Sequence, residues 1–120
     1  MLRAANFPLP IVRRQPFILV IGLRGADYTA LDFSFEVRDN PSSDQALLSF
    51  TKGAGITATF AMVNGQPYTE VRITATKETI LTLPESRPLG ADWDVLYAFK
   101  VQGLEYMAGT ATIRAAPNHL

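Results

Sequence analysis

The sequence contains no cysteine and only one histidine. Without cysteine the chain can form neither a disulfide framework nor a thiolate metal site. The single histidine, His119, lies one residue from the end of the given sequence, in a segment expected to fray. A metal ligand or a general base has to be held rigidly, and neither a Ser-His-Asp nor a Cys-His arrangement can be assembled from these residues. The inventory therefore predicts a protein that is not an enzyme and that uses no cofactor.

Long apolar runs and an excess of charge of either sign are also lacking. The longest apolar run covers residues 17–21, which is far too short to span a bilayer. Formal net charge is zero, whereas a dedicated nucleic-acid-binding domain normally carries a clear basic excess. With 120 residues, of which 48% are hydrophobic and 18% charged, the chain has enough apolar material for one packed core. We expect neither a membrane nor a nucleic acid as its partner.

Charge is distributed unevenly along the chain. All acidic residues lie at or after Asp27, so the first 24 residues carry only arginine: Arg3, Arg13, Arg14 and Arg24. Three prolines, Pro8, Pro10 and Pro16, favour an extended backbone in the same segment. We therefore predict an extended basic arm over residues 1–16, a folded domain over 17–115 and a flexible tail over 116–120. The arm either lies on the acidic body of a neighbouring copy or keeps a flexible terminus soluble.

From residue 17 onward, short β-type segments alternate with turn residues. Strands are predicted over residues 17–23, 33–38, 46–51, 56–63, 68–75, 93–101 and 104–115, with a helical turn capped by Thr76 over 77–83. The segment 17–23 is apolar on both faces, which indicates an interface or a strand covered on both sides. Asn64-Gly65 predicts a hairpin, and Gln66-Pro67 is expected to lengthen its loop. Strands at this spacing predict an all-β antiparallel β-sandwich with immunoglobulin-like topology, and a small barrel is the alternative.

A few polar residues are candidates for chemistry. Asp92 and Asp94 flank Trp93 and point to the same face of a predicted strand, as the paired carboxylates of a glycosidase would. Their simpler interpretation is that they are solvated residues at the end of a loop, or a weak calcium position, and Asp39 and Asp44 are open to the same interpretations. Tyr28, Tyr68 and Tyr106 fall near segment ends and are candidates for the surface.

One ordered pattern spans residues 17–114 and resembles a family of known proteins. It consists of an apolar strand ending in Arg24, the segment Leu31-Asp32-Phe33-Ser34-Phe35-Glu36-Val37-Arg38-Asp39-Asn40-Pro41, then Leu47-Leu48-Ser49-Phe50-Thr51, Gly55-Ile56-Thr57, Leu83-Pro84, Trp93-Asp94-Val95 and Gly109-Thr110-Ala111-Thr112-Ile113. This order is similar to that in small structural proteins of tailed bacteriophages, in particular the N-terminal β-sandwich domains of baseplate and tail-fibre proteins. The pattern departs from the family before residue 17 and over residues 62–68.

The resemblance implies a virion component, made in the host cytoplasm, that docks in several copies at the tail, the baseplate or the point of fibre attachment. Its partners would be other virion proteins and copies of itself, so that it is a homo-oligomer in the particle. Capsid decoration is an alternative role, and a carbohydrate-binding module is another. The family supplies no catalytic residues. The interface is predicted on the arm and on the first strand, at Arg3, Pro8, Pro10, Arg13, Arg14, Phe17, Ile18 and Val20.

Overall fold

Alternating apolar side chains give most strands of this protein one buried face. The computed structural model describes residues 9–12, 15–40, 45–83 and 93–114. Its elements are β1 (Leu9–Val12), β2 (Phe17–Arg24), β3 (Phe33–Arg38), β4 (Leu48–Lys52), β5 (Gly55–Val63), β6 (Gln66–Ala75), α1 (Lys77–Ile80), β7 (Trp93–Val101) and β8 (Leu104–Arg114). The predicted all-β class is confirmed, as are strands close to all seven predicted segments and the short helix after Thr76, whose hydroxyl caps it by accepting a hydrogen bond from the Thr79 amide (3.2 Å).

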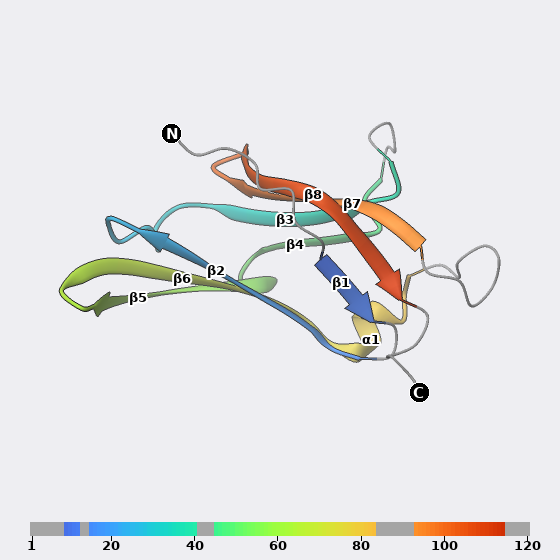
Figure 1. Ribbon diagram of the computed structural model, residues 1–120, viewed down its shortest axis with the longest axis horizontal. Helices are drawn as coiled ribbons and strands as arrows, with labels where there is room; N and C mark the ends of the chain where they lie inside the picture. The colour runs from blue at the N-terminus through green and yellow to red at the C-terminus, as the bar shows by residue number, and fades with distance from the viewer. Residues whose placement is uncertain (1–8, 13–14, 41–44, 84–92, 115–120) are drawn as a thin grey trace.

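The strands form one mixed sheet in the order β1-β8-β7-β3-β4-β5-β6-β2. Five of its ladders are antiparallel, whereas β1 with β8 and β4 with β5 are parallel. The sheet bends so far that it nearly closes into a barrel, with β2, β6 and β5 facing β3, β7 and β8 (Figure 1). The structure therefore shows the all-β class as one continuous mixed sheet, in which a hydrogen-bonded path joins the two sides that an antiparallel sandwich would keep separate.

That path passes through a tight corner between β4 and β5. The Ala54 amide donates to the Thr51 carbonyl (2.8 Å) and the Gly53 amide donates to the Ile56 carbonyl (2.9 Å), so the chain changes sides within a few residues. Gly55 has a φ of +101°, and a Cβ atom at this position would lie 2.5 Å from the ring of Phe50. Only glycine fits both conditions. The sequence indicates a turn at Gly53-Ala54-Gly55, but the alternation of the strands does not show that the chain crosses there from one side of the sheet to the other.

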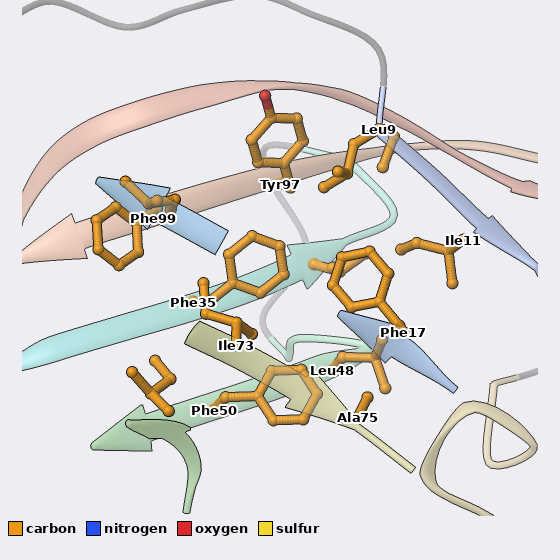
Figure 2. Close-up of a cluster of buried hydrophobic side chains, with 14 of the residues drawn as sticks. Leu9, Ile11, Phe17, Phe35, Leu48, Phe50, Ile73, Ala75, Tyr97 and Phe99 are labelled. Carbon is orange, nitrogen blue, oxygen red and sulfur yellow. The ribbon is translucent and has the colours of Figure 1, made fainter. Parts of the chain in front are cut away.

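Phe35 is the centre of the apolar core. Its ring centroid lies 6.1 Å from that of Phe17, 6.3 Å from that of Phe50 and 6.0 Å from that of Tyr97, so it joins four different strands. Phe33, Phe35 and Val37 all point inward, as the alternation in β3 predicts. Figure 2 shows these rings gathered between the two sides of the sheet.

Within the segment 1–16, which is predicted to lie outside the core, the structure places residues 9–12 in the sheet. Leu9–Val12 form β1, which pairs in parallel with the end of β8, and both Leu9 and Ile11 are buried. Figure 2 shows them pointing into the same cluster as Phe17 and Phe35. Pro10 points outward, and an edge strand tolerates a residue without an amide donor. The prolines favour an extended backbone, which is compatible with a strand at the edge of a sheet, and the alternation of Leu9, Pro10 and Ile11 favours one.

The hairpin between β5 and β6 is also tighter than expected. Asn64 and Gly65 both have positive φ values, 52° and 76°, and Val63 pairs directly with Gln66. The connection is therefore a two-residue turn, in which positive φ at both central positions matches the twist of the strands. Gln66 and Pro67 belong to β6 and not to the loop, and Pro67 pairs with Met62.

Substituting the buried residue of β1 tests whether this strand is part of the folded core. Ile11 is 0% exposed, so Ile11→Ala is expected to lower the free energy of unfolding by about 2–5 kcal/mol through the cavity it leaves. Ile18→Ala removes the same atoms from an exposed position in β2 and should cost less than about 1 kcal/mol. Urea denaturation of both variants measures the difference, and equal stabilities would show that β1 does not pack in the core.

Candidate functional site

Three connections meet at one end of the molecule, which we call the open end. They are the β2–β3 loop over residues 25–32, the β5–β6 turn and the β7–β8 turn. Strand register places them together, because Arg24 pairs with Tyr68 at the start of β6 and Phe33 pairs with Val101 at the end of β7. Figure 1 shows both hairpin turns and the end of β2 at the left of the molecule, away from α1.

The β2–β3 loop is fixed from several sides. Thr69 of β6, which is fully buried, accepts a hydrogen bond from the Tyr28 amide (2.9 Å) and donates one to the Ala26 carbonyl (3.1 Å). The ammonium group of Lys52 donates to the Thr29 carbonyl (2.9 Å) and to the Leu31 carbonyl (2.7 Å).

The β7–β8 turn holds the far end of the same loop. Gln102 donates from its amide to the Asp32 carbonyl (2.9 Å), and its side-chain oxygen accepts from the Asp32 amide (2.6 Å). The loop is thus anchored by β4, by β6 and by a second turn. The loop therefore holds its side chains in place before any partner binds.

Those side chains form the wall of a hollow, the open-end pocket. It has a volume of about 460 Å³ and is lined by Gly22, Leu23, Arg24, Tyr28, Leu31, Val101 and Tyr106. Leu31 and Val101 make much of the surface apolar, while two phenol groups and one guanidinium supply the polar groups. The pocket lies between β2 and the β7–β8 hairpin, so it opens at the end where the sheet is not closed.

The surroundings of the loop shift the pKa of two groups, Tyr106 and Asp27, away from neutral pH. Burial raises the pKa of Tyr106, and the neighbouring Tyr28 raises it further, so Tyr106 stays a neutral phenol that can donate a hydrogen bond. The hydroxyl and the amide of Thr29 both donate to Asp27 (2.6 Å and 2.9 Å) and lower the pKa of this carboxyl. Asp27 therefore stays ionised. Neither group is paired with a nucleophile or a second acid in a way that supports catalysis.

The apolar face of β5 extends past the part of the sheet that covers it. Ile56, Ala58, Phe60 and Met62 share the inward side of the strand, but the exposed fraction of the side chains rises from 0% at Ile56 to 42% at Phe60 and 59% at Met62. β4 pairs with β5 no further than Ile56. Beyond that point, the second edge of β5 has no partner strand among the described residues, and this free edge carries no charge.

The β7–β8 turn presents a second apolar residue at the same end. Leu104 is 75% exposed and pairs with Val101, so it projects on the inward side of the hairpin beside the pocket. Its neighbour Glu105 pairs with Lys100 and lies on the outward side. Of the seven exposed large apolar residues in the described part of the chain, four lie at the open end: Phe60, Met62, Val63 and Leu104.

The residues predicted as an interface are not brought together at this end. Phe17 is buried and contributes to the core, so it is not available for docking. Ile18 and Val20 are exposed on the outer face of β2, opposite Thr74 and Arg72. Pro10 is exposed in β1. The remaining candidates, Arg3, Pro8, Arg13 and Arg14, lie outside the described residues, as does the tail over 116–120.

The carboxylate candidates do not form a site in the part of the chain that is described. Asp94 accepts a hydrogen bond from the Thr112 hydroxyl (3.0 Å), and Asp39 accepts one from the indole of Trp93 (3.2 Å). Asp44, Asp92 and His119 lie outside the described residues. Over the described ranges, no group of three or more histidine, cysteine or acidic side chains is placed to hold a metal ion.

Sequence reasoning named the tyrosines but missed their arrangement. Tyr28 and Tyr106 line one pocket, whereas the ring of Tyr68 lies over Gly22 on the outer face of β2, where a Cβ atom would approach the ring to 2.6 Å. Nothing in the sequence analysis points to Met62, Leu104 or Phe60 as surface residues, and the exposure of all three is a finding of the structure. The sequence does contain one signal for their exposure. Met62 and Leu104 are large apolar residues within two positions of a tight turn, where strands on the opposite side of a sheet rarely cover a side chain.

Comparison with known proteins identifies no relative. No protein-family model, no curated protein and no solved structure matches this chain. Among the residues that the structure describes, no helix is both long and apolar enough to cross a membrane.

Replacing Thr69 tests whether the buried hydroxyl fixes the loop. Thr69→Val keeps the shape but leaves the Tyr28 amide and the Ala26 carbonyl without their partner, and we expect it to lower the free energy of unfolding by about 1–3 kcal/mol. It should also speed hydrogen exchange at the Tyr28 amide. Thr69→Ser is the control, because it loses a methyl group but retains both hydrogen bonds. Slow exchange at Tyr28 in the valine variant would contradict this role.

Proposed function

We propose that this domain is a non-catalytic structural module of a tailed-bacteriophage virion, which docks onto neighbouring virion proteins through its open end. One observation supports the docking role above the others: a rigidly anchored loop, an apolar pocket and four exposed apolar side chains gather at a single end. Such a concentration of exposed apolar groups is typical of protein interaction sites. The assignment to a virion rests on the order of sequence motifs alone.

Within the virion, the tail, the baseplate and the point of fibre attachment are the proposed locations, with capsid decoration as the alternative. An uncharged free edge in β5 suits all of them, since it can add a strand from a neighbouring protein. The proposal keeps one feature of the predicted immunoglobulin-like sandwich: two sides of the sheet enclose a common core.

A carbohydrate-binding module is the second candidate, and it is favoured by the position of Tyr28 and Tyr106 in one pocket. Sugar hydroxyls require several closely spaced hydrogen-bond partners, whereas this pocket offers two phenols and one guanidinium among apolar side chains. The lining suits an apolar protein side chain better. Saturable binding on a glycan array, lost in Tyr106→Ala, would favour the carbohydrate-binding module over protein docking.

Incorporation into particles tests the proposed function. Mass spectrometry of gradient-purified particles from the phage that encodes the chain should detect it at a fixed ratio to the major structural proteins. Met62→Asp places a charge on the exposed apolar face of the open end and should reduce incorporation at least about tenfold.

Leu81→Asp is the matched control, because Leu81 follows α1 and is exposed to a similar degree but lies away from the open end. It should be incorporated normally. A chain that is absent from purified particles would contradict the virion assignment, and normal incorporation of Met62→Asp would contradict docking through the open end.

A further inference from the structure

The open end carries both halves of a self-complementary contact. On one side, the end of β5 presents Phe60 and Met62 inward and the end of β2 presents Arg24 outward, next to Tyr68. On the other side, the start of β8 presents Leu104 inward and Glu105 outward. Each side therefore has an apolar group on the core side. On the outer side, Lys100 opposite Glu105 is already ion-paired with Glu36 (3.3 Å), so the charges left without a partner in the described residues are Glu105 on one side and Arg24 on the other, and these are opposite.

From this arrangement, which builds on the proposed assembly role, we infer that a second copy of this chain binds the open end. The two copies meet end to end and are related by a twofold axis. The β7–β8 turn of each copy contacts the β2–β6–β5 side of the other. Leu104 of each copy packs on Phe60 and Met62 of its partner. The same rotation brings Glu105 and the partner copy's Arg24 to one side of the contact.

Symmetry explains why the charges fit. A twofold contact uses the same patch on both copies, so the patch has to contain each group together with its complement. Because the second copy is rotated by 180°, its β2–β6–β5 side lies opposite the β7–β8 side of the first copy. The outward face of β8 in one copy then continues into the outward face of β2 in the other. Neither Arg24 nor Glu105 forms an ion pair with another described residue, so both are free to pair across the contact.

The cross-section of the molecule is large enough to contain a contact of standard size. Perpendicular to its longest axis the molecule measures 33 × 24 Å. A flat end-to-end contact is limited by this cross-section to roughly 800 Å², about the area that each partner contributes to a standard protein interface. The contact would also cover the mouth of the open-end pocket, beside which Leu104 projects. Pre-anchoring of the loop lowers the entropy lost when the copies associate.

Sedimentation velocity on the purified protein at concentrations up to about 1 mM tests this inference. We expect a reversible monomer–dimer equilibrium. Leu104→Ser should raise the dissociation constant at least about tenfold, since an exposed apolar anchor is lost without disturbing the core. Leu81→Ser, which changes the same residue type at an exposed site away from the open end, should leave the dissociation constant within about twofold of the original.

Charge reversal separates this contact from other modes of association. Arg24→Glu and Glu105→Arg should each raise the dissociation constant about tenfold, and the double variant should return it to within about threefold of the unmodified chain. A chain that stays monomeric, a dimer unaffected by Leu104→Ser or a double variant without rescue would each overturn the inference. If the dimer fails these tests while Met62→Asp is still excluded from particles, a different virion protein occupies the open end and the proposed function stands.

Discussion

β2 and β6 pair along the whole length of β2, and β5 pairs with β6 from Ile56 to the turn, whereas β4 reaches β5 only as far as Ile56. One side of the sheet is therefore longer than the strands that cover it. Side-chain alternation continues beyond the cover, and the inward positions there, Phe60 and Met62, are apolar. The exposed Phe60 and Met62, the free edge of β5 and the pocket between the two sides all follow from this mismatch in length.

Because of this mismatch, the open end would not be ordered if the β2–β3 loop were not anchored. Thr69, Lys52 and Gln102 attach this loop to three separate parts of the sheet, and Thr69 does so from a fully buried position. Fixing the loop in advance carries an entropy cost during folding that does not have to be met again on binding. The open end is thus exposed and apolar but ordered, a combination that suits recognition of a partner.

Local patterns predicted much of the fold. Alternation located β3, β5, β6 and β7 and the buried face of β3, and the capping residue Thr76 marked the start of α1. Features that depend on residues distant in sequence were not predictable in this way. The parallel pairing of Leu9–Val12 with β8 and the corner at Gly55 against Phe50 require knowledge of which strands become neighbours. The exposure of Phe60 was not predictable for the same reason, because periodicity gives the face of a strand but not whether anything lies on that face.

The claim that the open end is buried in the assembled state can be tested at the level of single amides. Hydrogen exchange should be compared between dilute and concentrated protein, below and above the association range. We expect slower exchange at high concentration over residues 57–63 and 102–106, with no change in α1 or at the β1 edge. Protection that appears on the β1 edge or around α1, and not at the open end, would contradict the account.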